Sequence, residues 1–197
     1  MIKDQTVGAY VDALASGSAT PGGGAAAALT VAQAAALITM ACNFILGRER
    51  FSAQAQEVEQ LKSVSEGVRA LALAAVQEDV MAFEGVRAAY GLQATDPARQ
   101  QAVQLALKAA SSVPARVFQP MECLAKAAHQ LRPLANPRLV SDIDVALGLL
   151  TGAAYGLRVM ARVNLELVHD AEFRGAFEAT MQQASQAIRA VTRSTDY

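Results

Sequence analysis

A single aspartate interrupts an apolar helical stripe in the middle of the chain. Asp79 lies at the spacing of the apolar face, together with Ala75, Ala82 and Phe83. A carboxylate on such a face is costly unless it is paired or its pKa rises until it is neutral. A raised pKa suits acid and base catalysis near neutral pH. Two structural alternatives remain: an ion pair with an arginine of another helix, or a drift of the stripe that turns Glu78 outward.

Three consecutive glycines precede a long apolar segment. Gly22, Gly23 and Gly24 follow Thr20 and Pro21, and a helix is expected directly after them. The N–H groups at a helix N-terminus can hold an anion, and glycine leaves them accessible. The segment matches neither a Walker loop nor a dinucleotide-binding glycine motif. The alternative is a turn where two backbones approach closely.

Further polar side chains lie where a ligand could reach them. Asn136, Ser141 and Asp142 belong to the segment NPRLVSD at the start of an expected helix. Capping and turn geometry would explain Asn136 and Ser141 without any ligand. Asn43 and Asn164 are amides within apolar helical patterns. If buried, they need hydrogen-bond partners from another helix or from a ligand.

Few residues of the sequence fit a metal site or a reactive cysteine site. The two histidines are His129 and His169, and Glu166-x-x-His169 matches only half of a di-iron helix motif. Cys42 and Cys123 lack the spacing of a zinc site or a redox pair, and they fit a reducing cytoplasm. We therefore expect no metal and no disulfide.

The composition predicts a soluble, all-α protein. Hydrophobic residues make up 53% of the 197 residues, charged residues only 18%, and the apolar part is rich in helix-forming alanine. The net charge is −1 and no run of Lys or Arg occurs, which argues against a nucleic-acid partner or an anionic membrane anchor. No signal peptide is expected, and the predicted location is cytoplasmic. The length favours a single domain over residues 1–197.

One uncharged segment has the length of a membrane span. Residues 25–47 contain no charged side chain. However, the segment is rich in alanine, carries several polar side chains and lacks a basic flank. A helix buried inside a bundle explains it better, so no membrane association is expected.

Hydrophobic periodicity predicts a bundle of long helices. Helices are expected over residues 4–15, 25–47, 53–89 and 96–113, up to residue 131 after a proline break, from residue 141 onward, and over 171–193. Asp96 and Ser141 are the expected N-caps of two of them. The first helix should bury one face formed by Val7, Tyr10, Val11 and Leu14. Gly148, Gly152 and Gly156, spaced by four, form a smooth stripe that favours close packing of another backbone.

Taken together, these motifs resemble the cyclodeaminase/cyclohydrolase family. The resemblance extends from the first helix to about Val168. It rests on the segments LASGSATPGGGAAAAL, MACNFILGR, EDVMAFEGVRAAYGL, ALKAASSVPARV, NPRLVSDIDVALGLL and RVNLELV. It implies an all-α fold, a homodimer and a tetrahydrofolate substrate, with no further cofactor. It also implies Asp79 as the catalytic residue. The substrate-binding residues that it implies are Gly22, Gly23, Gly24, Asn43, Asn136, Ser141, Asp142 and Asn164.

The resemblance implies one of two reactions at a single carbon of the folate. A formiminotetrahydrofolate cyclodeaminase lets N10 attack the formimino carbon while ammonia leaves. A methenyltetrahydrofolate cyclohydrolase adds water to the methenyl carbon, and the ring opens to 10-formyltetrahydrofolate. Both pass through a tetrahedral carbon and require proton transfer but no metal.

Some positions depart from the family pattern. Ile45 stands where a threonine is common, and Ala161 stands where an asparagine is common. The loss of a hydroxyl and an amide raises an alternative: a catalytically silent helical dimer that binds a folate or another anion. A pure interaction scaffold without a pocket is a third possibility.

Overall fold

The protein is all-α, as the sequence predicts. The computed structural model describes residues 2–192, and this part contains helices and no strand. The α-helices are α1 (Val7–Ala15), α2 (Gly23–Leu46), α3 (Ala55–Gly91), α4 (Arg99–Phe118), α5 (Met121–Leu131), α6 (Pro137–Leu165) and α7 (Ala171–Thr192). The short 3-10 helices are η1 (Ile2–Asp4), η2 (Glu49–Gln54) and η3 (Arg132–Leu134).

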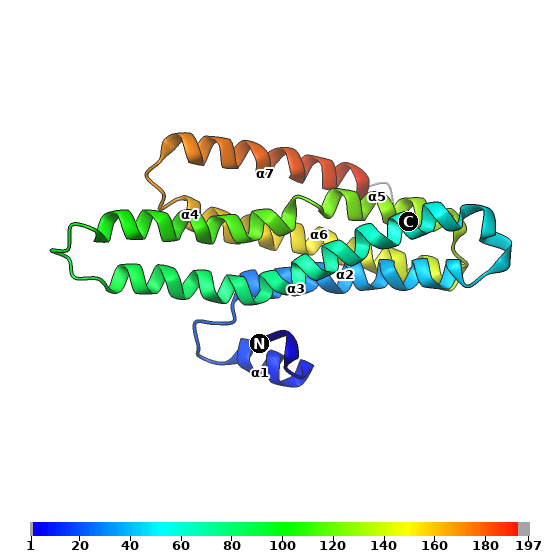
Figure 1. Ribbon diagram of the computed structural model, residues 1–197, viewed down its shortest axis with the longest axis horizontal. Coiled ribbons are helices and arrows are strands. Elements are labelled where there is room, and N and C mark those ends of the chain that lie inside the picture. Colours follow the sequence, from blue (N-terminus) through cyan, green and yellow to red (C-terminus); the bar gives the residue numbers. More distant parts are fainter. Residues whose placement is uncertain (1, 193–197) are drawn as a thin grey trace.

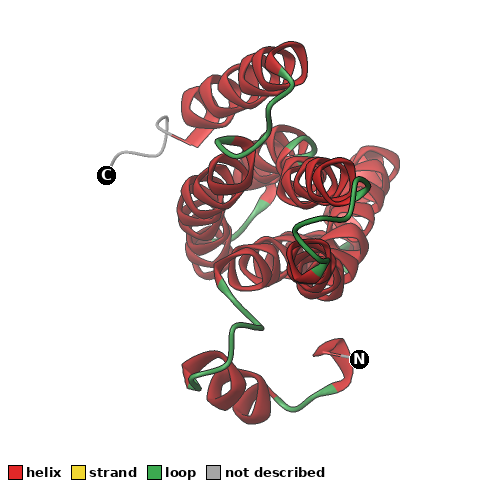
Figure 2. Cartoon of the chain, turned by 90° about the vertical axis from the view of Figure 1, so that its left-hand side faces the viewer, coloured by secondary structure: helices red, strands yellow, loops and turns green. Residues whose placement is uncertain are grey.

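The long helices form an elongated bundle. α2, α3, α4 and α6 run along its length, and α5 continues the bundle beyond the end of α4 (Figure 1). α7 covers one side, whereas α1 lies on the opposite side and stands away from the other helices (Figures 1 and 2).

Helix α2 forms the centre of the core because its side chains are small. Ala25, Ala28, Ala34 and Ala35 are buried, and α3 and α6 pack directly against it. The Thr39 hydroxyl lies 2.8 Å from the Ser65 hydroxyl of α3. A Cβ atom at Gly156 of α6 would lie 3.2 Å from the Ala27 Cβ. These contacts fix α2 antiparallel to both neighbours, and they confirm the close packing expected for Gly156. Gly148 and Gly152 are exposed.

The first helix differs from the prediction. Residues 2–4 form η1, and α1 begins only at Val7, with the Thr6 hydroxyl accepting a hydrogen bond from the Ala9 N–H at 3.2 Å. Of the expected apolar face, only Tyr10 is buried; Val7 is 82% exposed. The reason is the extended connection between α1 and α2, which holds α1 off the bundle (Figure 2).

Two helix starts and one helix end were also predicted wrongly. α4 begins at Arg99, because the Asp96 carboxylate accepts a hydrogen bond from the Ala98 N–H at 2.8 Å and stabilises a turn. The same helix continues through Pro114 to Phe118 instead of ending before the proline.

The N-cap of α6 is Asn136, not Ser141. The Asn136 side chain accepts hydrogen bonds from the N–H groups of Arg138 and Leu139 at 3.0 and 3.1 Å. Ser141 therefore lies inside the helix, and its hydroxyl donates to the Arg138 carbonyl. Asp144, three residues after Ser141, forms an ion pair with Arg132 at 3.1 Å.

By length and composition alone, α2 and α6 could cross a membrane. Half of the most apolar window of α2 and a third of that of α6 are buried in the bundle. Core helices of soluble bundles pass the same test. The last helix extends to the end of the described residues; Arg193, its predicted end, lies outside them.

Candidate active site

The Asp79 carboxyl group lies against the N-terminus of α2. Its Oδ2 accepts a hydrogen bond from the Ala25 N–H at 2.9 Å. A Cβ atom at Gly24 would lie 2.0 Å from Oδ1 and 2.7 Å from Oδ2. A side chain at position 24 and the carboxyl group therefore cannot occupy this space together. Gly24 thus leaves room for the Asp79 carboxyl, and the close contact is with this side chain and not with a second backbone.

The surroundings of Asp79 favour its neutral form. Burial raises the pKa of this carboxyl, and the hydrogen bond from Ala25 offsets the rise only in part. Among residues 2–192, Asp79 forms no ion pair, so the structural alternative of an arginine partner is wrong. Glu78 is the residue that pairs, with Arg116 of α4. A desolvated carboxyl without a counter-charge is suited to exchange protons near neutral pH.

Tyr10 is a neighbour of Asp79 that the sequence analysis did not single out. It is only 7% exposed although it belongs to α1, whose other residues face solvent. Within the described chain its hydroxyl is buried and has no hydrogen-bond partner. Burial and the charge of Asp79 both raise the pKa of the phenol. The sequence signal was a polar-tipped side chain on the apolar face of α1.

Gly22, Gly23 and Asn164 belong to the same end of the bundle. A Cβ atom at Gly23 would lie 3.1 Å from the Met160 Sδ of α6, and one at Gly22 would meet only the Ala19 carbonyl at 3.6 Å. Asn164 follows Met160 by one turn, is half-buried, and donates a long hydrogen bond of 3.5 Å to the Met160 carbonyl.

The other four predicted site residues lie at the opposite end. Asn43 is 19 residues beyond Gly24 on α2, which corresponds to about 28 Å along the helix. Because α6 is antiparallel to α2, its first turns, with Asn136, Ser141 and Asp142, also lie at that end. Within one chain, the predicted residues therefore fall into two clusters. The Asp79 cluster comprises the predicted Gly22, Gly23, Gly24, Asp79 and Asn164, together with Tyr10, which was not predicted. The Asn43 cluster comprises Asn43, Asn136, Ser141 and Asp142.

The Asn43 cluster is more open than expected. Asn43 is exposed, so the expected buried amide is wrong here, and it borders a surface hollow of about 360 Å³ between Phe44 and Arg69. Asn136 caps α6, as the capping interpretation allowed, whereas the Ser141 hydroxyl donates to the Arg138 carbonyl inside the helix. No group of three metal-ligating side chains occurs in residues 2–192.

The two departures from the family pattern lie in the core. Ile45 and Ala161 are each 1% exposed. Ile45 belongs to the end of α2 remote from Asp79, so within one chain the missing hydroxyl does not remove a contact to that carboxyl.

The protein is thus an all-α bundle that sets a half-buried carboxyl group against a glycine-rich helix N-terminus, an arrangement that acid and base chemistry can use. The chain belongs to the formiminotransferase-cyclodeaminase family, whose model matches residues 6–183.

Individual relatives agree with this assignment. The chain is 35% identical to a methenyltetrahydrofolate cyclohydrolase of Methylorubrum extorquens, over 82% of this chain and 78% of the relative. It is 27% identical to the formimidoyltransferase-cyclodeaminase of Rattus norvegicus, of which it spans 35% of the length. The crystal structure of formiminotetrahydrofolate cyclodeaminase from Thermotoga maritima superimposes with a TM-score of 0.84, at 27% identity over 98% of both chains.

Proposed function

We propose that this protein is a folate one-carbon enzyme that hydrolyses 5,10-methenyltetrahydrofolate to 10-formyltetrahydrofolate. The observation that carries the proposal is the Asp79 carboxyl, desolvated and without a counter-charge, at the glycine-lined N-terminus of α2. The extensive similarity to a free-standing cyclohydrolase supports this reaction over others.

In this mechanism Asp79 transfers the proton between water and the folate. Ionised Asp79 removes a proton from the water that attacks the methenyl carbon, and the resulting acid returns this proton to N5 as the C–N5 bond breaks. The hydroxyl on the former methenyl carbon loses its own proton to solvent as the formyl carbonyl forms. The Ala25 N–H holds Oδ2 in place. The N-terminal dipole of α2 stabilises the ionised form, whereas burial stabilises the neutral form, so both states are accessible.

The substrate provides the reacting group, and we propose no metal and no further cofactor. The remaining residues of the Asp79 cluster, Gly22, Gly23, Gly24 and Asn164, would contact the substrate. We also propose a cytoplasmic enzyme, since Cys42 and Cys123 are both free thiols.

We also propose that the protein is a homodimer. The exposed stripe of α6 carries Val145, Gly148, Gly152, Tyr155 and Val159, an apolar face that a second copy would cover. A copy packed antiparallel along α2 would also bring its Asn43 cluster to the Asp79 cluster of the first. Asn43, Asn136, Ser141 and Asp142 could then serve the same substrate.

Formiminotetrahydrofolate deamination is a second candidate. The 0.84 TM-score to a cyclodeaminase favours it. The same carboxyl could deprotonate N10 and protonate the leaving ammonia. The catalytically silent binding dimer remains the alternative to both enzymes.

Parallel assays separate these functions. The purified protein is mixed with 5,10-methenyltetrahydrofolate, and the loss of the methenyl absorbance is followed; ammonia release is measured with 5-formiminotetrahydrofolate. We expect the larger rate with the methenyl substrate. A larger rate with the formimino substrate would identify the deaminase. No rate above the uncatalysed reaction with either substrate, together with a melting temperature raised by 5-formyltetrahydrofolate, would identify the silent binder.

A further inference from the structure

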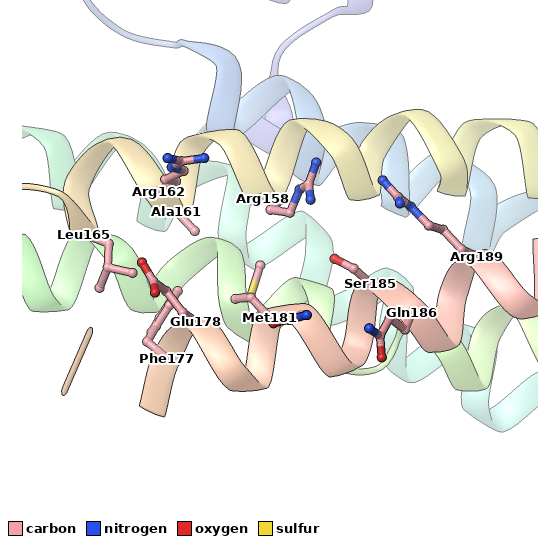
Figure 3. A pocket seen from close by; sticks show the side chains of 11 residues that line it. Arg158, Ala161, Arg162, Leu165, Phe177, Glu178, Met181, Ser185, Gln186 and Arg189 are labelled. Carbon is pink, nitrogen blue, oxygen red and sulfur yellow. The ribbon is translucent and has the colours of Figure 1, made fainter. Parts of the chain in front are cut away.

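A second concave surface lies between α6 and α7. It is a groove of about 500 Å³ that both helices line along several turns (Figure 3). On α6, the groove residues Arg158 and Arg162 are two positions before and after Met160, which faces Gly23 of the Asp79 cluster. Two positions correspond to about 200° around a helix, so the groove lies on the opposite side of α6 from Asp79.

Three arginines line this groove. Arg158 and Arg162 are one turn apart on α6, and Arg189 extends from α7 toward α6 (Figure 3). Arg162 is held by Glu166 at 2.8 Å. Arg158 and Arg189 form no ion pair with any residue in the described part of the chain, and the Arg158 guanidinium lies 6.0 Å from the Tyr155 ring. Two uncompensated guanidinium groups thus border one concave surface.

The rest of the lining suits a ligand with both polar and apolar parts. Ser185 and Gln186 provide hydrogen-bonding groups from α7, and Leu165 and Met181 provide apolar surface. The one acidic side chain of the lining, Glu178, lies beside Leu165 at the end away from Arg189 (Figure 3).

A smaller hollow adjoins the groove at its positive end. It measures about 200 Å³ and shares Arg158, Ser185 and Arg189 with the groove. Arg158 and Arg189 therefore border both spaces, at a point where a ligand in either could reach them.

We propose that the α6–α7 groove is a binding site for a small polyanion that carries phosphate or carboxylate groups. Arg158 and Arg189 would each donate paired N–H groups to the anion, and Ser185 would donate its hydroxyl. A guanidinium group binds a carboxylate or phosphate group through two N–H groups at once. Such charged, bidentate pairs are stronger than hydrogen bonds from neutral donors. The anion would also relieve the repulsion between two like charges on one surface.

Calorimetric titration of the full chain tests the site. Inorganic pyrophosphate and citrate are the probes, because they present phosphate and carboxylate groups respectively. We expect at least one to bind the unmodified protein, and the tighter probe identifies the ligand chemistry. The double variant Arg158→Gln/Arg189→Gln should weaken that binding by about tenfold or more, since it removes charged hydrogen bonds to the ligand.

Arg87→Gln is the matched control. Arg87 is an exposed arginine of α3 that pairs with Glu84, and its loss should leave binding unchanged. Circular dichroism melting verifies that all variants are folded. Equal affinity of the double variant and the unmodified protein would overturn the proposal, as would a lack of binding of either probe at millimolar concentration.

Discussion

At the residue scale, the raised pKa of Asp79 makes the stability of the fold depend on pH. Burial raises its pKa above 3.8, so the folded chain holds the proton more tightly than the unfolded chain. The free energy of unfolding therefore falls as the pH rises from about 3.8 through the raised pKa, because the desolvated group must then ionise. The proposed catalytic role of Asp79 thus carries a cost in stability.

Asp79→Asn should separate the two effects. The amide oxygen can still accept the Ala25 N–H, but the side chain no longer ionises. We expect a melting temperature at pH 7 equal to or above that of the unmodified protein, and turnover reduced by about a hundredfold. The stability of the variant relative to the unmodified protein should increase as the pH rises through this range. A folded and fully active Asp79→Asn enzyme would refute the catalytic assignment.

Tyr10→Phe tests the unpaired hydroxyl. A buried hydroxyl without a partner costs about 1–3 kcal/mol, so its removal should raise the melting temperature by a few degrees. If the hydroxyl also bonds to the substrate when the substrate is present, turnover should fall in the same variant. We expect both changes together, measured by thermal melting and by the cyclohydrolase rate. A lowered melting temperature would mean that the phenol bonds within the fold.

At the element scale, the start of α2 depends on one glycine more than on its neighbours. Gly24→Ala would force a Cβ atom onto the Asp79 carboxyl, whereas Gly22→Ala would meet only a carbonyl at 3.6 Å. We expect Gly24→Ala to push the Asp79 carboxyl away, to break its hydrogen bond with the Ala25 N–H and to lower turnover strongly. Gly22→Ala, the matched comparison, should leave the melting temperature unchanged and lower turnover less than Gly24→Ala, because its Cβ atom does not reach Asp79. Similar behaviour of both variants would show that the glycines form only a connector.

Long periodic helices such as α2 and α3 could be predicted from the sequence, but the starts of α4 and α6 could not. The stripe of α3 and the small residues of α2 indicated a helical bundle, and both helices lie within two residues of the predicted bounds. The starts of α4 and α6 were wrong because Asp96, Asn136 and Ser141 all favour turns and caps. Only the backbone geometry decides which of them accepts the first free N–H.

The sequence also indicated Asp79, because a charge in an apolar stripe is visible without a structure. Tyr10 was missed, since its contact depends on the path of the chain between α1 and α2. The division of the predicted residues into two clusters was likewise invisible. It follows from the antiparallel register of α2 and α6, which residue types do not encode.

At the scale of the whole molecule, the exposed stripe of α6 should be an interface. Gly152→Glu places a charge in the middle of that stripe, without any clash inside one chain. We expect sedimentation of the unmodified protein as a dimer and of this variant as a monomer. Gly85→Glu is the control, because Gly85 is an equally open, exposed glycine on α3. A monomeric unmodified protein at micromolar concentration would contradict the dimer.

The detached position of α1 has a kinetic consequence. Apart from Tyr10, the residues of α1 lie at the surface, and η1 adds a hydrogen bond from the Ile2 N–H to the Gln77 side chain at 3.1 Å. A segment with so few buried contacts can open locally while the bundle remains folded. Its amide hydrogens should then exchange with solvent much faster than those of α2. Each opening would withdraw Tyr10 from the half-buried Asp79 and leave its carboxyl more hydrated, so one folded molecule would alternate between a less and a more hydrated carboxyl.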